Sequence, residues 1–154
     1  MQIQIHYDKE LHAAEFIRLN EAWISEHFQI EKGDLSLARD PMRVVREGGS
    51  IISLDRGDRI VGVCALFNEG AGRFQLARMA VEKSERGKGL GKKLLGVALE
   101  RARNMGASSV YLLSNTCLQA AIHLYQRHGF KTVSTGRHPT YARCNIVMEI
   151  RFSS

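Results

Sequence analysis

The chain has 154 residues, of which 44% are hydrophobic and 25% are charged, which is typical of one globular domain over residues 1–154 and excludes a disordered chain. No stretch approaches the ~18 consecutive apolar residues of a membrane span, and the first residues lack a basic region followed by an apolar run, so we expect a cytoplasmic protein with no membrane partner. The net charge of +6 favours an anionic partner, but the basic residues are scattered, which fits a phosphate-bearing small molecule as well as nucleic acid.

The first third of the chain predicts a strand and then helices. Residues 2–6 alternate polar and apolar side chains, which favours a strand, and residues 11–28 carry apolar side chains at helical spacing, which favours one long or broken helix. Asp40 followed by Pro41 is typical of a helix start, and the glycines at 48–49 end that short segment.

The middle of the chain predicts three consecutive antiparallel strands. β-Branched residues lie on either side of the turn formers at 55–58, which indicates a hairpin over 50–67. A second turn at 68–72 leads into a third strand over 74–81.

The segment after Gly87 predicts a helix and a parallel strand. Apolar positions up to Met105 follow helical periodicity, and Gly106 stands where a C-terminal glycine cap is expected. Residues 109–113 (SVYLL) form a short apolar run suited to a strand buried on both faces. Strand, helix and strand in this order imply a right-handed parallel crossover.

The last part of the chain predicts one more helix and two strands. Residues 116–119 match a capping box, and the helix that follows ends at Gly129. Residues 130–133 and 145–152 favour two final strands joined by a longer loop. We therefore expect an α/β (α+β) fold with a mixed, mostly antiparallel sheet of about seven strands flanked by about four helices.

The cysteines give no sign of a disulfide or metal framework. Cys64, Cys117 and Cys144 are an odd number, are widely spaced and form no CxxC pair. We therefore expect buried or half-buried free thiols and no bound metal.

Residues 86–91 (RGKGLG) join a predicted strand to a predicted helix. Glycines let backbone amides approach a ligand closely, and amides at a helix start bind phosphate oxygens with help from the helix dipole. A Walker A loop needs Ser or Thr after its Gly-Lys, where this chain has Lys93 or Gly89. A dinucleotide fingerprint needs a third glycine where this chain has Lys92. The loop therefore predicts a pyrophosphate site of another kind.

This loop resembles the Arg/Gln-x-x-Gly-x-Gly/Ala signature of the GNAT superfamily of acyl-coenzyme A N-acyltransferases, matched by Arg86, Gly89 and Gly91. The resemblance implies a GNAT-like fold, an N-acetyltransferase and the cosubstrate acetyl-coenzyme A as acetyl donor. It also implies direct attack of a primary amine within a ternary complex.

The resemblance extends beyond the loop. Residues 79–81 resemble the end of the family's fourth strand, where splayed backbone groups bind the pantetheine arm and the acyl carbonyl. Asn115 follows the SVYLL strand, and Ala121 to Phe130, with Tyr125 between them, resemble the family's second cofactor-binding segment. The residues that the resemblance assigns to cofactor binding are Met79, Ala80, Val81, Arg86, Gly87, Lys88, Gly89, Leu90, Gly91, Lys92, Asn115 and Tyr125.

By resemblance, Tyr125 is also the catalytic acid that protonates the departing thiolate, since a phenol with a pKa of about 10 keeps its proton at neutral pH. The resemblance further implies that a backbone amide within residues 79–81 stabilises the oxyanion. The fourth-strand position where some family members carry Glu is Gln75 here, which is a departure from the pattern. The remaining candidates for the general base are Glu69, His123, Glu21, Glu26 or a water chain.

The acceptor is not identified by the sequence and is a small-molecule or peptide amine. Trp23, Phe28, Tyr141 and Arg143 are candidates to line its pocket, although apolar residues at helical spacing are more often core. A covalent acyl-enzyme on Cys117 is less favoured than a structural thiol, because the sequence has no His or Asp at a spacing that indicates a catalytic partner for this cysteine.

Two other functions stay open. One is a module that binds acyl-coenzyme A without transferring the acyl group, and Gln75 supports it. The other is a basic nucleic-acid-binding protein, suggested only by the net charge and opposed by the lack of a basic run, so we expect no nucleic-acid partner. A homodimer and acyl groups other than acetyl are also possible.

Overall fold

The computed structural model describes residues 2–152, in which seven strands form one sheet with the order β1-β2-β3-β4-β5-β7-β6. The strands are β1 (Ile3–Tyr7), β2 (Ser50–Arg56), β3 (Arg59–Asn68), β4 (Arg73–Val81), β5 (Ser109–Ser114), β6 (Lys131–Thr135) and β7 (Ile146–Arg151). The α-helices of this range are α1 (Ala13–His27), α2 (Lys32–Arg39), α3 (Arg43–Arg46), α4 (Leu90–Asn104) and α5 (Gln119–Arg127). All strand pairs are antiparallel except β4 with β5.

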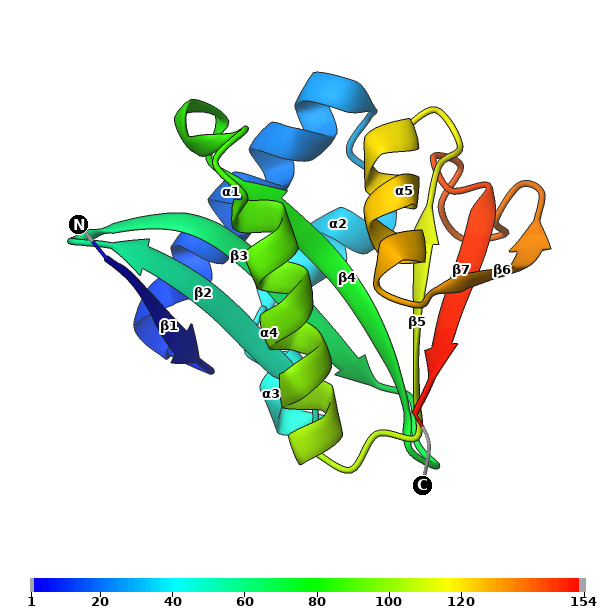
Figure 1. The fold of residues 1–154 in the computed structure, drawn as a ribbon. Coiled ribbons are helices and arrows are strands. Elements are labelled where there is room, and N and C mark those ends of the chain that lie inside the picture. Colours follow the sequence, from blue (N-terminus) through cyan, green and yellow to red (C-terminus); the bar gives the residue numbers. More distant parts are fainter. Residues whose placement is uncertain (1, 153–154) are drawn as a thin grey trace.

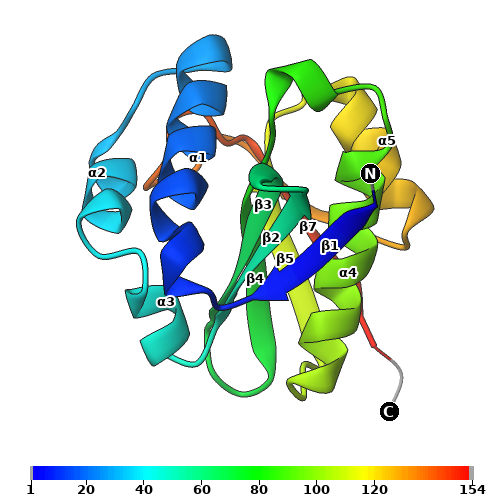
Figure 2. The same cartoon turned by 90° about the vertical axis from the view of Figure 1, so that its left-hand side faces the viewer.

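The helices cover both faces of the sheet. Helices α1, α2 and α3 lie on one side, and α4 and α5 lie on the other (Figures 1 and 2). Successive residues of β3 alternate between the two faces, as strand geometry requires. Val63 and Ala65 pack with the apolar side chains of α1, while Cys64 and Leu66 pack with those of α4. The sheet therefore separates two apolar cores.

The sheet opens between β4 and β5. Their parallel pairing covers only Arg73–Gln75 against Ser109–Tyr111. Beyond this point the two strands diverge, as Figure 1 shows. Strand β5 turns instead to β7, with which it pairs along its whole length from Ser109 to Ser114. The far half of β4 thus has no neighbour on one side, and this opening positions the site described below.

A β-bulge interrupts β4 within the unpaired half. The register jumps from Ala65↔Ala77 to Val63↔Ala80, so two residues of β4, Arg78 and Met79, stand opposite one residue of β3. Arg78 has a φ of +60°, which is uncommon for a residue other than glycine. Bulges of this kind redirect a side chain.

Most predicted elements are confirmed. The hairpin over residues 50–67, the third antiparallel strand and the parallel crossover are all present. Helix α4 ends just before Gly106, whose φ of +88° is the conformation of a glycine cap. The mixed, mostly antiparallel sheet of seven strands agrees with the expected fold class, and the five helices exceed the expected four by one.

Several local predictions are wrong. Residues 116–119 form no capping box, because α5 begins at Gln119 and the Thr116 hydroxyl accepts a hydrogen bond from Asn145 instead. Strand β5 fully buries only alternate residues, and the residues between them are half-buried, so the strand is not buried on both faces. The structure also contains a helix that was not predicted, α2. Asp40 is the C-cap of α2, and Met42 is the N-cap of α3, so the predicted helix start at Asp40 is wrong.

The three free cysteines differ in their burial. Cys64 and Cys144 are buried, but Cys117 is exposed, which corrects the expectation for that residue. Within residues 2–152, no helix is long and apolar enough to cross a membrane. The same residues contain no group of three or more His, Cys, Asp or Glu arranged to hold a metal ion.

Candidate active site

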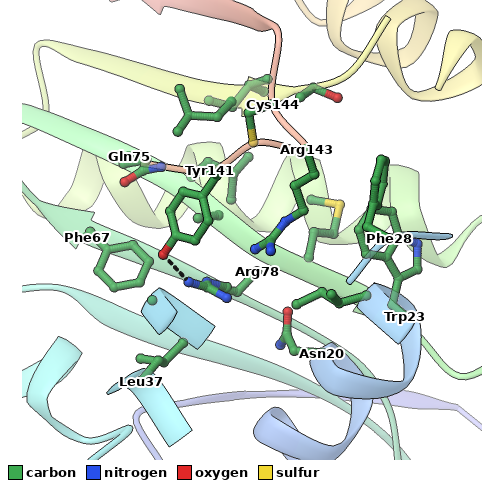
Figure 3. Close-up of a pocket in the computed structure, with 18 of the residues that line it drawn as sticks. Asn20, Trp23, Phe28, Leu37, Phe67, Gln75, Arg78, Tyr141, Arg143 and Cys144 are labelled. Atoms are coloured by element: carbon green, nitrogen blue, oxygen red, sulfur yellow. Dashed lines mark hydrogen bonds between the residues drawn. The ribbon is translucent and has the colours of Figure 1, made fainter. Parts of the chain in front are cut away.

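A central cavity of about 440 Å³ lies where the sheet opens, between α1 and α2 on one side and β4, β5 and α5 on the other. Its apolar wall comes from α1, α2 and β3 and consists of Trp23, Ile24, Phe28, Leu37 and Phe67 (Figure 3). This volume falls within the range of about 300–1,000 Å³ that is usual for small-molecule sites. The cavity therefore has the size and the lining of a ligand pocket.

The polar part of the cavity is a pair of arginines held from behind by a carboxylate. Arg78, at the bulge of β4, pairs with Asp34 and donates to the Tyr141 hydroxyl at 2.6 Å (Figure 3). Arg143 donates two parallel hydrogen bonds to the same carboxylate, both at 2.7 Å, and a third to Glu31 at 3.1 Å. The side chains of Arg78 and Arg143 are 9% and 12% exposed, and that of Asp34 is only 2% exposed.

Helix α2 positions this group through its first turn. The Glu31 amide donates to the Asp34 carboxylate at 2.8 Å, and the Glu31 side chain caps the helix in return. Gly33 makes room for Tyr141, because a Cβ at this glycine would lie 2.2 Å from the phenol oxygen. Arg143 reaches α2 from the loop before β7, so the contact ties two segments about a hundred residues apart.

The charges in this group perturb one another. Burial would raise the pKa of Asp34, but hydrogen bonds from Arg143, the Glu31 amide and Arg78 outweigh it, so the pKa of this carboxyl is lowered. Burial lowers the pKa of Arg143, but the hydrogen bond to Asp34 outweighs it, so that pKa is raised. The Asp34 carboxylate and the Arg143 guanidinium group therefore stay charged at neutral pH.

Tyr125 of α5 also lines the cavity. Its ring packs edge to face on Phe130, with the ring centroids 5.9 Å apart. Burial raises the pKa of the phenol to about 12. The hydroxyl forms no hydrogen bond with any group in residues 2–152. It is thus a protonated donor with no partner in the described chain.

The glycine-rich loop before α4 presents a row of backbone amides. Gly87 and Gly89 have φ values of +81° and +82°, which only glycine adopts readily. The Arg86 amide closes a 3₁₀ turn onto the Lys83 carbonyl at 3.3 Å. The amides of residues 87–92 donate to no backbone or side-chain acceptor within residues 2–152. A Cβ added at Gly91 would meet nothing within 4 Å, so space is open beside these amides.

The basic side chains of this loop have carboxylate partners. Arg86 pairs with Glu26 of α1 at 2.7 Å. Lys88 lies 3.5 Å from Glu85, a buried carboxylate that also binds Arg59 at 3.1 Å. The loop is therefore anchored to the β2–β3 turn and to α1.

The structure brings some of the predicted site residues together and separates others. Met79, Asn115 and Tyr125 line the central cavity. The Asn115 side chain is already bonded to the Arg143 carbonyl at 2.8 Å and the Cys117 amide at 2.9 Å. Ala80 is buried in the core under α1, and Val81 lines a smaller depression of about 170 Å³ beside Arg86. The loop residues Gly87 to Lys92 lie outside the central cavity.

The candidate bases do not reach the cavity. Gln75 lines it, as its place on β4 suggested. Glu69 sits in the β3–β4 turn and accepts a hydrogen bond from Tyr111. Glu21, His123 and Glu26 are absent from the lining of this cavity, and Glu26 is paired with Arg86. Cys117 does not line it either.

The candidate acceptor residues do line the cavity. Trp23, Phe28, Tyr141 and Arg143 all face it (Figure 3). Sequence reasoning missed Arg78 and Asp34. The only sequence signal for Asp34 is its spacing from Glu31, which fits a capping pair with acidic residues at both positions. Arg78 gives no signal, because a bulge cannot be read from the residue types around it.

Together, the opening between β4 and β5, the glycine loop at the start of α4 and the tyrosine that lines the cavity define an α/β fold of the acyltransferase class. The chain belongs to the acetyltransferase (GNAT) family, whose model matches residues 10–130.

Individual relatives agree with this assignment. The chain is 33% identical over 88 residues to N-acetyltransferase family 8 member 2 of Rattus norvegicus, a match that covers 54% of this chain and only 39% of the rat protein. It is similar in fold to a GNAT acetyltransferase of Staphylococcus aureus, with a TM-score of 0.84 at 20% identity, over 97% of this chain and 99% of that one. It is also similar to yncA of Salmonella typhimurium, solved with its cofactor acetyl-CoA, with a TM-score of 0.77 at 18% identity, over 100% of this chain and 96% of that one.

Proposed function

We propose that this protein is an N-acetyltransferase that moves the acetyl group of acetyl-coenzyme A to a primary amine by direct attack in a ternary complex. The observation that carries the proposal is the row of unpaired amides from Gly87 to Lys92 beside open space at Gly91. Family membership and the relative solved with acetyl-CoA support it. Acetyl-coenzyme A supplies an activated acetyl group on a thioester.

The residues proposed to hold acetyl-coenzyme A fall into two groups. The loop from Arg86 to Lys92 offers amides at a helix N-terminus, which suit the oxygens of a diphosphate. Arg86 would exchange its contact with Glu26 for one with this diphosphate. Residues 79–81 and Asn115 flank the opening between β4 and β5 and are proposed to hold the arm that carries the thioester.

Tyr125 is proposed to give its proton to the departing thiolate. Its hydroxyl has no partner in residues 2–152, and burial keeps the phenol protonated. The amine must lose a proton before it attacks. Since neither Glu69, His123, Glu21 nor Glu26 lines the cavity, we propose that water carries this proton away.

Release of free thiol from acetyl-coenzyme A tests this function. We expect wild-type protein to release thiol in the presence of a suitable amine from a panel, with formation of the acetylated amine seen by mass spectrometry. Tyr125→Phe should release it at least about a hundredfold more slowly. Tyr111→Phe is the matched control, because Tyr111 bonds to Glu69 and does not line the cavity.

A second function has one observation in its favour. Gln75 lines the cavity where some family members carry Glu, so a protein that binds acyl-coenzyme A without turnover is the alternative. Binding of acetyl-coenzyme A without thiol release for any amine would favour this alternative over the enzyme. A cytoplasmic location, a homodimer and the use of other acyl groups stay predictions from the sequence.

A further inference from the structure

We infer that the acceptor is a free α-amino acid with an apolar side chain, and that Arg78 binds its carboxylate. This inference rests on the proposed N-acetyltransferase function and names the substrate class of the same site. Three features of the cavity carry it: the guanidinium group of Arg78, the distribution of charge around it, and the apolar wall on either side of it.

Arg78 has hydrogen-bonding capacity that the protein does not use. A guanidinium group has five N–H donors. In Arg78 one of them reaches Asp34 and one reaches Tyr141, and the others have no acceptor within residues 2–152. Since the side chain is only 9% exposed and lines the cavity, these free donors face the cavity and not bulk water.

The charge on the cavity wall is one-sided. Asp34 pairs with both arginines and is 2% exposed, and Glu31 pairs with Arg143 as well. Neither carboxylate lines the cavity. The lining carboxylates Asp40 and Glu47 belong to exposed side chains that pair with Arg46 and Arg43. An incoming ligand therefore meets guanidinium groups on the inner wall and no free carboxylate. Such a wall selects an anionic group, and two parallel bonds from a guanidinium suit a carboxylate best.

The backbone at Arg78 supports a role in binding. A non-glycine residue with a φ of +60° costs stability and persists only where the surroundings hold it. Here the bulge, the Asp34 carboxylate and the Tyr141 hydroxyl hold Arg78 in place, and Gly33 leaves the space for Tyr141. An arginine fixed in this way loses little side-chain entropy when it binds a carboxylate.

The rest of the cavity suits an apolar side chain of modest size. In Figure 3, Leu37 and Phe67 lie on one side of Arg78, and Trp23 and Phe28 lie on the other. The cavity volume of about 440 Å³ also has to admit the thioester end of the donor. The remaining space fits one amino acid, and a peptide bond in place of the carboxylate would leave the free donors of Arg78 without a charged partner.

The wild-type enzyme tests the inference without any variant. Leucine, methionine and phenylalanine are compared as acceptors with their amides, with a leucine-glycine dipeptide and with the amines that lack the carboxylate, such as 3-methylbutylamine for leucine. We expect kcat/KM for the amino acids to be at least about tenfold higher than for each counterpart, because a charge-assisted pair is lost in the counterparts.

The Arg78→Lys variant then tests whether Arg78 is the residue that binds the carboxylate of the amino acid. The lysine keeps a positive charge beside Asp34 but loses the planar fork. We expect the preference for leucine over 3-methylbutylamine to fall at least about fivefold. Arg46→Lys is the control, because Arg46 is exposed, pairs with Asp40 and does not line the cavity.

Each outcome has a distinct meaning. Equal or faster acetylation of 3-methylbutylamine, the amides or the dipeptide overturns the amino-acid inference and leaves the acetyltransferase proposal standing. Equal losses for leucine and 3-methylbutylamine in Arg78→Lys would show that Arg78 only supports the fold, which contradicts its assignment. Absence of thiol release with every amine would defeat the proposed function and this inference together.

Discussion

Tyr125 combines two properties that its residue type alone does not specify. Burial raises the pKa of the phenol to about 12, and the hydroxyl has no protein partner in the described chain. We therefore predict that kcat/KM for the amine rises with pH toward the pKa of the amine and shows no decline from loss of the Tyr125 proton below about pH 10. The measurement is a pH–rate profile of thiol release from pH 6 to 10.

The pH–rate profile of the Tyr125→Phe variant provides a second test of this prediction. Its residual rate should rise with pH in the same way, because deprotonation of the amine does not depend on the phenol. A falling limb near pH 8 in the wild type that vanishes in Tyr125→Phe would contradict the raised pKa of this phenol.

Asp34 makes a prediction about stability at the residue scale. Its pKa in the folded protein is lowered from 3.8 in spite of burial, so the unfolded chain binds a proton more readily at this group. The stabilisation from Asp34 is therefore complete above about pH 4 and is lost as pH falls through the folded pKa. Asp34→Asn leaves Arg78 without its carboxylate partner and removes the bidentate partner of Arg143, so it should cost about 3–5 kcal/mol at pH 7.

Urea unfolding of the wild type and of Asp34→Asn at pH 7, 5 and 3 measures this effect. The difference in unfolding free energy between them should shrink as the pH falls below 4. Glu47→Gln is a suitable control, since the Arg43–Glu47 pair is exposed and such pairs contribute at most about 1 kcal/mol. A difference that stayed constant with pH would mean that the Asp34 charge is not what stabilises the fold.

At the scale of elements, the start of α4 supplies a test of the loop with little effect on stability. Gly91 lies in the first turn of α4, and an added Cβ there would meet no atom within 4 Å. The family signature accepts glycine or alanine at this position, so a larger side chain is needed to block the site. Glutamine is a better helix former than glycine by about 0.5 kcal/mol, so Gly91→Gln should fold as well as the wild type or better. If a diphosphate binds beside the amides, the glutamine side chain occupies its space, and we predict at least a tenfold loss of coenzyme A affinity.

Gly96→Gln is the matched control. Gly96 lies in the same helix, and a Cβ added there would also meet nothing within 4 Å. Titration calorimetry with coenzyme A should therefore give wild-type affinity for Gly96→Gln. Unchanged affinity in Gly91→Gln would locate the diphosphate away from this loop.

The elements that could be predicted from the sequence are those whose signals are local. Helix α4 has regular apolar spacing and a glycine cap, and the β2–β3 hairpin has turn residues between β-branched runs. Helix α2 escaped prediction because it is eight residues long and its only buried side chain is the polar Asp34. Its stability depends on contacts with Arg78 and Arg143, which no local pattern reports.

At the scale of the whole molecule, the parts of the site that could be predicted are again those with a local signal in the sequence. The glycine-rich loop at 86–91 could be found in the sequence because its residues are consecutive. The central cavity takes its lining from α1, α2, β4, α5 and the loop before β7. Its polar cluster depends on a bulge in β4 and on an Arg143–Asp34 pair that spans most of the chain. Such contacts depend on the tertiary fold and leave no local pattern in the sequence. The expectation of one domain over residues 1–154 stays a prediction.

Because the proposed donor site joins α4 to the open half of β4, binding should stabilise the molecule as a whole. A ligand at about 100 times its dissociation constant adds about 2.7 kcal/mol to the unfolding free energy. For a protein of this size that corresponds to a rise in Tm of about 5–10 °C. Differential scanning calorimetry with increasing acetyl-coenzyme A should show this rise in the wild type and in Gly96→Gln.

The same titration on Gly91→Gln separates specific binding from a general effect of a polyanion on a basic protein. A chain with a net charge of +6 gains some stability from any multivalent anion, and salt screens that gain. The rise caused by acetyl-coenzyme A should persist at 0.3 M NaCl in the wild type and be strongly reduced in Gly91→Gln, which has the same charge. If 0.3 M NaCl abolished the rise, or if both proteins gained equally, the stabilisation would come from net charge and not from the amides of the loop.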